Sequence, residues 1–263
     1  MTRMMIVPAA GLGSRLGVSV PKVLALVAGR PMIDHLLALY GRTVSRFVVV
    51  ASPAGQGLLE AHLRDREEVI DLVVQEEPTG MLDAVMVPYD LVLRHQPERV
   101  WITWCDQLAV HGRTVARLLQ AESARVEPDV VLPTCASPAP YIHFERDSSQ
   151  RIVAVRQRRE GDAMPECGES DMGLFSLSRS AYLRDLRMYA DAPEHGQATQ
   201  ERNFLPFIPW LAATHRVVTF PCVDPIEAVG INTPDELRRI EAHLRLVEAR
   251  GADIDEELSG TDV

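Results

Sequence analysis

The stretch IVPAAGLGSRLGVSVPKVL, residues 6–24, decides the fold of this 263-residue chain. A short apolar run is followed at once by three glycines, which predicts a buried strand and then a tight turn. Backbone N–H groups in such a turn can converge on an anion. Arg15 and Lys22 add positive charge to the same segment, although these letters also fit a glycine turn beside two solvated cations.

The glycine spacing separates this loop from two other nucleotide-binding loops. Gly11, Gly13 and Gly17 follow G-x-G-x-x-x-G, whereas a dinucleotide-binding turn needs G-x-G-x-x-G. The predicted second strand, residues 46–51, also ends without the acidic residue that would bind a ribose. No G-K-[ST] ending of a Walker loop is present. A dinucleotide-dependent oxidoreductase is therefore the least favoured function.

The composition excludes several classes of protein. The formal net charge is −10 at pH 7, with 46% hydrophobic and 24% charged residues, which indicates a globular chain that does not bind nucleic acid or an anionic membrane. The four cysteines include no C-x-x-C pair, which predicts reduced thiols. The N-terminal apolar run is too short for a signal peptide, and no stretch approaches the roughly 20 apolar residues of a membrane span. We expect a cytoplasmic protein, and a homo-oligomer stays open.

Short apolar runs alternate with amphipathic helical patterns over the first half of the chain, which predicts a parallel sheet covered on both faces. The predicted strands are residues 4–9, 46–51, 69–75, 99–105 and 129–134, and the predicted helices between them are residues 31–42, 55–67, 80–95 and 111–126. The order then changes to a hairpin over 141–155, strands over 171–178 and 216–221, and helices over 198–215 and 233–250.

The chain divides into one domain and a short tail. Residues 1–250 contain all of the predicted strands and helices, so we expect them to form a single domain. Residues 251–263 contain five acidic residues and no basic one, a composition that predicts a disordered tail.

Five segments resemble a known family of enzymes. PAAGLGSRLGVSVPKVLALVAGRPMIDHLL (8–37) is similar to the signature of nucleotidyltransferases that make nucleoside-diphosphate sugars. The further segments are QEEPTGMLDAV (75–85), WCDQLAV (104–110), DMGLF (171–175) and EAVGINTPDELRRIEAHL (227–244). In particular, the chain resembles the uridylyltransferase domain of bacterial N-acetylglucosamine-1-phosphate uridylyltransferases. The resemblance implies a Rossmann-like three-layer α/β/α fold with a mostly parallel mixed sheet, and we expect the family's β-helix domain to be missing.

The resemblance implies a nucleotidyltransferase of the pyrophosphorylase type. Such an enzyme transfers a nucleoside monophosphate from a nucleoside triphosphate, UTP or CTP, to a sugar 1-phosphate and releases pyrophosphate. The acceptor phosphate is already ionised near neutral pH, so catalysis depends on alignment and charge neutralisation and needs no protein nucleophile. Arg15, Lys22 and Asp106 are the residues implied for catalysis.

Asp106 and Asn232 are implied as the protein ligands of one Mg²⁺ ion. Asp106 follows a predicted strand, so it should lie at the carboxyl end of that strand, where open α/β sheets bind ligands. Mg²⁺ prefers oxygen ligands and takes few of them from the protein when phosphates are present. Each residue alone also fits a structural role, Asp106 as a cap of the following turn and Asn232 as a cap of the last helix, where Thr233 is an equally good cap.

The residues implied for nucleotide binding lie in two segments of the chain. Gln75 would meet the base through its two-sided amide, and Gly80 would do so through close backbone approach. The family usually has threonine where this chain has Met81, which leaves the identity of the base open. The full set is Ala9, Ala10, Gly11, Gly13, Arg15, Gln75, Gly80 and Met81.

The residues implied for acceptor binding are Lys22, Gln157, Arg158, Asp171 and Gly173. Asp171 stands where the uridylyltransferases carry an asparagine that touches the sugar, and Gln157 stands where they carry a glutamate. These differences argue against N-acetylglucosamine 1-phosphate itself as the acceptor. Arg158 belongs to a basic run that fits a solvated charged surface as well as a phosphate clamp.

Two other functions stay open. A cytidylyltransferase acting on a non-sugar phosphate or phosphonate would fit Met81 and Asp171, and Asp171 would suit a cationic acceptor such as an amino alcohol phosphate. A nucleotide-binding regulator without activity would have no use for both cations and both metal ligands, so the retention of all four argues against it. The expected partners are therefore a nucleoside triphosphate and a small phosphorylated acceptor.

Overall fold

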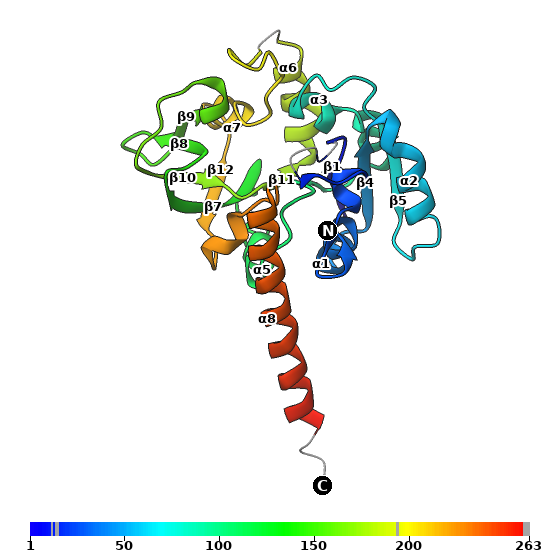
Figure 1. Cartoon of the computed structure of the whole chain (residues 1–263). Coiled ribbons are helices and arrows are strands. Elements are labelled where there is room, and N and C mark those ends of the chain that lie inside the picture. Colours follow the sequence, from blue (N-terminus) through cyan, green and yellow to red (C-terminus); the bar gives the residue numbers. More distant parts are fainter. Residues whose placement is uncertain (12, 14–15, 193–194, 260–263) are drawn as a thin grey trace.

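A mixed sheet of eight strands forms the centre of the molecule (Figure 1). The computed structural model describes residues 1–11, 13, 16–192 and 195–259. Seven strands lie in the order β10-β7-β11-β6-β1-β4-β5, and β12 pairs with β7 beside this path. Their bounds are β1 Arg3–Pro8, β4 Arg46–Ala51, β5 Ile70–Val74, β6 Arg99–Thr103, β7 Val130–Pro138, β10 Cys167–Asp171, β11 Leu174–Ser178 and β12 Val217–Pro221.

The sheet is mostly parallel, as predicted. β1 runs parallel to β4 and β6, β5 runs parallel to β4, and β12 runs parallel to β7. β11 is antiparallel to both β6 and β7, and β10 is antiparallel to β7. The strand predicted over 171–178 is wrong in one respect, because Gly173 takes a left-handed φ of 67° and divides it into β10 and β11.

Helices connect most of the parallel strands. Their bounds are α1 Met32–Tyr40, α2 Pro53–Leu63, α3 Met81–Met86, α4 Tyr89–His95, α5 Gly112–Glu122, α6 Arg187–Ala190, α7 Phe207–Ala212 and α8 Pro234–Ser259. The single helix predicted over 80–95 is two helices, since Pro88 stands between α3 and α4 and has no N–H to donate. The helix predicted over 198–215 shortens to α7, and the helical segment over 181–190 is absent from the prediction.

Two apolar cores, one on each face of the sheet, create three layers. Along β1 the side chains alternate, so that Met5 and Val7 enter one core while Met4 and Ile6 enter the other. The first core also contains apolar side chains of α1, α5 and α8, and the second contains those of α3 and α7. This arrangement confirms the Rossmann-like three-layer α/β/α fold with a mostly parallel mixed sheet.

A hairpin extends the molecule on the side of β10 (Figure 1). β8 (Ile142–Arg146) and β9 (Ile152–Gln157) pair antiparallel, close to the hairpin predicted over 141–155. β8 lies against β10, and β9 lies against α7. A second short ladder, β2 (Leu26–Val27) with β3 (Arg30–Pro31), precedes α1.

Helix α8 extends away from the rest of the molecule (Figure 1). Ile240 is buried in the first core, whereas Leu246, further along, is exposed. The helix continues through Ser259, so part of the segment predicted as a disordered tail is helical, and residues 260–263 lie outside the described residues. The domain boundary at residue 250 stays a prediction. Of the helices described, none is both long and apolar enough to cross a membrane.

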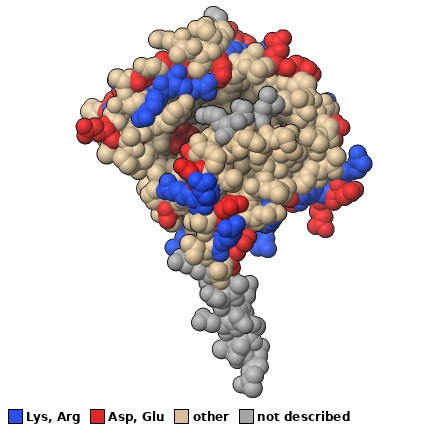
Figure 2. Space-filling view, in the orientation of Figure 1, with Lys and Arg blue, Asp and Glu red and all other residues tan. Residues whose placement is uncertain are grey.

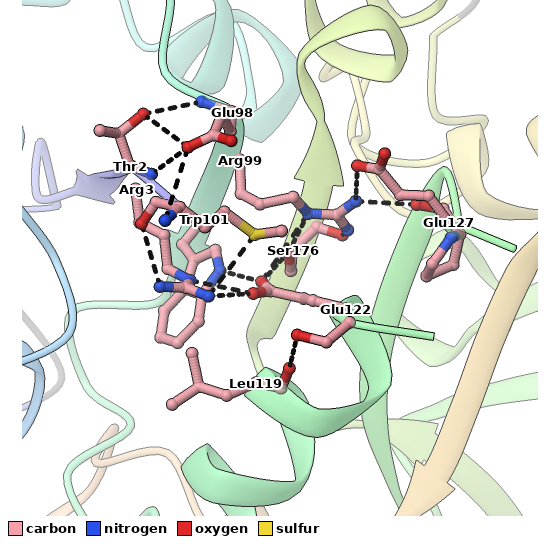
Figure 3. Close-up of polar contacts among 12 residues, drawn as sticks. Thr2, Arg3, Glu98, Arg99, Trp101, Leu119, Glu122, Glu127 and Ser176 are labelled. Carbon is pink, nitrogen blue, oxygen red and sulfur yellow. Dashed lines mark hydrogen bonds and ion pairs between the residues drawn. The ribbon is translucent and has the colours of Figure 1, made fainter. Parts of the chain in front are cut away.

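A buried ionic cluster lies at the amino end of β6 (Figure 3). Arg99 and Glu122 are almost completely buried, with Nε and Oε1 3.7 Å apart. The Arg99 guanidinium donates to the hydroxyl and carbonyl oxygens of Ser176, and the Glu122 carboxylate accepts from Trp101, Ser176 and Arg3. Each buried charge is therefore both neutralised and hydrogen-bonded, as burial in a low-dielectric interior requires.

Candidate active site

The carboxyl ends of β1, β4, β5 and β6 meet at the other edge of the sheet, because these strands are parallel. The segments that follow β1, β5 and β6 carry residues implied by the sequence, namely Ala9, Ala10, Gly11 and Gly13 after β1, Gln75, Gly80 and Met81 after β5, and Asp106 after β6. Open α/β sheets bind their ligands at this edge. Figure 2 shows a hollow between the parts of the molecule that carry β1 and β9, with Lys and Arg side chains gathered over β9 at one rim.

The loop after β1 folds back on itself to place Lys22. The Ala9 N–H donates to the end of β4 at 2.8 Å, and the Lys22 N–H donates to the Gly11 carbonyl at 3.2 Å. Gly13 packs so closely that an added Cβ would lie 3.2 Å from the Cβ of Lys22. Arg15, which is implied for catalysis and nucleotide binding, lies outside the described residues.

Lys22, Asp106 and Asn232 come together from three distant parts of the chain. Lys22 Nζ forms an ion pair with Asp106 Oδ2 and donates to Asn232 Oδ1 at 2.9 Å. The side chains of Lys22 and Asp106 are only 12% and 15% exposed, so their attraction acts in a partly desolvated site. The structure therefore brings Asp106 and Asn232 together as the resemblance implies, while their roles stay predictions.

The Asn232 amide points into this cluster and does not cap α8. Its Nδ2 donates to the Gly230 carbonyl at 3.3 Å, which leaves Oδ1 for Lys22. Thr233 is the cap, because its hydroxyl accepts from the Glu236 N–H at 3.3 Å. The Glu236 carboxylate in turn accepts from the N–H groups of Asn232 and Thr233 at 2.8 Å, which completes a capping box. The Asn232 side chain is thus available as an oxygen ligand.

The two side-chain oxygens fit a Mg²⁺ ion. One carboxylate and one amide supply the hard oxygen donors that this ion prefers. Within the described part of the chain, no group of three or more His, Cys, Asp or Glu side chains could hold a metal, so phosphates would have to complete the coordination. The Lys22 ammonium contacts both oxygens, which indicates that the position between them suits a cation.

Glu227 connects, through hydrogen bonds, the two segments that carry the implied metal ligands. It is completely buried, and its Oε1 accepts from the N–H groups of residues 223 and 224 at 2.7 and 2.8 Å. Its Oε2 accepts from the His111 N–H at 2.8 Å. The sequence prediction missed this residue, although the D-P-I-E pattern that ends at Glu227 is the signature of a capping box.

Gln75 and Gly80 contact each other beyond the end of β5. Gln75 is nearly buried, and its Nε2 donates to the Gly80 carbonyl at 3.2 Å. Gly80 has a φ of 134°, and an added Cβ would lie 2.4 Å from the Arg202 carbonyl oxygen, so only glycine fits there. This glycine is therefore required by the chain's own backbone, whatever it contacts in a bound nucleotide. Met81 begins α3 and is half-buried.

Gln157 and Arg158 lie where β9 ends. The side chain of Gln157 is buried, and Arg158 is exposed at the start of the next turn. The other two arginines of the run 156–159 are paired with glutamates, whereas Arg158 donates to the carbonyls of residues 139 and 140 and has no carboxylate partner among the described residues. No hydrogen bond joins this group to Lys22 in the described structure.

Asp171 ends β10 beside the indole of Trp104. Asp171 Oδ1 accepts from the backbone N–H of Gly173 at 2.8 Å, and the backbone N–H of Trp104 donates to the Gly173 carbonyl at 2.9 Å. An added Cβ on Gly173 would lie 2.2 Å from the indole, so the glycine is required. Burial raises the pKa of Asp171 to about 6, and hydrogen bonds from Gly173, its own N–H and Trp104 offset only part of that effect.

Comparison with known proteins identifies the family to which the chain is similar. A family model described as the MobA-like NTP transferase domain matches residues 5–170. The bifunctional protein GlmU of Stutzerimonas stutzeri (strain A1501) is 27% identical over 252 residues, which cover 93% of this chain and 52% of that protein. GlmU of Desulfitobacterium hafniense (strain Y51) is 26% identical over 244 residues, which cover 90% of this chain and 51% of that protein.

A solved structure shares the fold. The inositol-1-phosphate CTP transferase from T. maritima superposes with a TM-score of 0.66 at 19% identity, covering 89% of this chain and 91% of that one. At this identity the likeness shows the fold alone. The chain spans about half the length of the curated relatives it matches.

Proposed function

Because this chain belongs to the MobA-like NTP transferase family, we propose that it is a Mg²⁺-dependent nucleotidyltransferase. It transfers a nucleoside monophosphate from UTP or CTP to a sugar 1-phosphate and releases pyrophosphate. The observation that carries the proposal is the contact of Lys22 with Asp106 and Asn232 at the carboxyl edge of the sheet. Such a site collects the charges that phosphoryl transfer needs, and the transfer itself requires no protein nucleophile.

The reaction is a displacement at the α-phosphorus of the triphosphate. An oxygen of the acceptor phosphate forms a bond to that phosphorus, and the bond to the bridging oxygen of the β-phosphate breaks. The electron pair of the broken bond leaves with pyrophosphate. Lys22 and Arg15 offer positive charge to these oxygens. The backbone N–H groups of Ala9, Ala10, Gly11 and Gly13 hold the triphosphate in line.

Asp106 and Asn232 would hold the Mg²⁺ ion. When bound, Mg²⁺ neutralises phosphate charge that develops during the transfer. Glu227 keeps the two ligand-bearing segments at a fixed separation through its three backbone hydrogen bonds. Gln75 and Gly80 form the wall against which the base binds. The family usually has a threonine in the place of Met81, and Met81 has no hydroxyl to hydrogen-bond the base.

A second candidate is a cytidylyltransferase whose acceptor is a non-sugar phosphate or phosphonate. Asp171 favours it, because a carboxylate without a described cationic partner lies where the sugar-binding relatives are expected to place a neutral amide. Met81 also favours it, since the base pocket differs from the pattern of the uridylyltransferases. The chemistry at the α-phosphorus is the same in both candidates.

A pyrophosphate-release assay over the four ribonucleoside triphosphates, each with a panel of phosphorylated acceptors, tests both candidates. We expect release with UTP or CTP, only with Mg²⁺ and only with an acceptor. Asp106→Ala should abolish turnover, and Lys22→Ala should lower it about 10²–10³-fold, the usual cost of one preorganised charge. Asn232→Ala should have a milder effect than Asp106→Ala. It should raise the Mg²⁺ concentration needed for turnover without abolishing turnover, because water can replace a neutral ligand.

Urea unfolding of the same variants is the control. Lys22 and Asp106 are only 12% and 15% exposed, so removing one partner should cost some stability, and turnover is compared under conditions in which urea unfolding shows every variant to be folded. Full activity of Asp106→Ala at saturating Mg²⁺, or metal-independent activity of the parent, would contradict the proposed function.

A further inference from the structure

We propose that the acceptor carries a positively charged nitrogen, which binds the Asp171 carboxylate beside the Trp104 indole. This inference rests on the proposed function and names the chemical class of its acceptor. That class is a phosphate monoester or phosphonate that also bears an ammonium group.

Asp171 is a carboxylate for which the described chain supplies no cation. Its oxygens meet only neutral donors, the Gly173 N–H, its own N–H and the indole, and no described Lys, Arg or His pairs with it. Carboxylates on neighbouring elements, in contrast, each have a cationic partner, as in the pairs Asp106–Lys22, Glu145–Arg156 and Glu169–Arg146. A partly buried, unpaired carboxylate costs free energy, and a cationic ligand would recover it.

Trp104 adds a second feature that suits a cation. Phe175 and Phe204 pack against its indole, with ring centroids 5.3 and 6.0 Å away, so the ring is held in place. Both phenylalanines are almost completely buried, whereas Trp104 is only half-buried and keeps part of its surface accessible. An indole attracts an ammonium group within about 6 Å of its centre, and quaternary ammonium ligands are recognised in this way.

The site therefore offers opposite charges to the two ends of one small molecule. Two cations are assigned to the phosphate: Lys22, whose ammonium also contacts Asp106 and Asn232, and Arg158, which has no carboxylate partner among the described residues. Asp171 is the anion available to an ammonium group. Asp171 lies against the segment that runs from Trp104 to Asp106, so both charges belong to the same end of β6. A sugar 1-phosphate without a basic nitrogen would supply no cation to Asp171, which has none among the described residues.

Calorimetric binding, measured with Mg²⁺ and an unreactive CTP or UTP analogue, tests the inference without turnover. The cationic probes are phosphocholine, phosphoethanolamine and glucosamine 1-phosphate, which separate an amino alcohol from an amino sugar. The neutral probes are glucose 1-phosphate and N-acetylglucosamine 1-phosphate. We expect at least one cationic probe to bind more tightly than both neutral ones, and Asp171→Asn to weaken it about 10- to 100-fold, the value of a hydrogen bond to a charged group.

Asp90→Asn is the matched control, because it removes the same charge from an exposed position on α4 and should change no affinity. Equal binding of neutral and cationic probes to the parent, or equal weakening of both by Asp171→Asn, would overturn the inference. Pyrophosphate release with the neutral sugar phosphates alone would overturn it while keeping the proposed function. Selective binding of a cationic probe without pyrophosphate release from any triphosphate would keep the inference and overturn the proposed function.

Discussion

A carboxylate without a cationic partner among the described residues, as at Asp171, lowers the stability of the free protein. Its pKa is about 6 in the folded chain, against an ordinary value of 3.8. Between these values the native state binds more protons than the unfolded state, so the contribution of Asp171 to the free energy of unfolding decreases as the pH rises. A shift of about two pKa units corresponds to a loss of at most about 3 kcal/mol above pH 6.

Asp171→Asn should therefore be more stable than the parent at neutral pH and equally stable near pH 4. The amide keeps the hydrogen bond from the Gly173 N–H while removing the charge. Urea unfolding of both proteins at pH values across this window measures the difference. A difference that is the same at every pH would show that the charge of Asp171 is not its cause.

Among the structural elements, the short 3-10 helix η5 (Pro225–Ala228) is the one that positions Asn232. Glu227→Gln replaces one of the two accepting oxygens of the buried carboxylate with an NH₂ group, which then faces a backbone N–H. We expect a loss of about 1–3 kcal/mol of stability. We also expect a higher Mg²⁺ concentration for half-maximal activity, because the separation of Asp106 and Asn232 is no longer fixed.

Electron paramagnetic resonance of Mn²⁺ with bound nucleotide measures the affinity of Glu227→Gln for metal without turnover. A variant destabilised far from the site, such as Glu122→Gln, is the control and should keep the parent's affinity. Unchanged Mn²⁺ affinity in Glu227→Gln would mean that Glu227 supports the fold alone.

Most of the elements follow from local sequence pattern. Apolar residues recur with the period of the strand or helix that they form, so β4 begins and ends where predicted. Prediction fails where a tertiary contact determines the backbone conformation. At Gly173 the indole of Trp104 leaves no room for a Cβ, and no local pattern reveals that approach.

The sequence marks some residues of the candidate site and gives no clear sign of others. Lys22 and Asp106 stand next to a proline turn and a strand end, which mark them in the sequence. Glu227 was missed because its partner His111 lies 116 positions away along the chain. The partner is visible only once the strands are ordered in the sheet.

For the molecule as a whole, the ionic cluster of Figure 3 is a place where the loss of one charge should lower the stability strongly. Glu122→Gln removes the negative charge that faces the buried guanidinium of Arg99, and an uncompensated buried charge costs about 3–5 kcal/mol. We expect the midpoint of urea unfolding to fall accordingly, while turnover of the folded fraction stays at the parent's value.

Glu127→Gln is the matched control, since Glu127 also contacts Arg99 but its side chain is 59% exposed. Solvent already screens this pair, so the change in stability should be much smaller. Equal effects of the two substitutions would mean that burial does not govern the strength of this cluster.

The buried ionic cluster and the candidate active site lie at opposite ends of the strands. Amino ends gather the buried network of Arg99 and Glu122, and carboxyl ends gather Lys22, Asp106 and Asn232. Substitutions at sites that share no partners add independently. In evolutionary terms, single substitutions around Asp171 can therefore accumulate while the opposite ends of the strands preserve the scaffold.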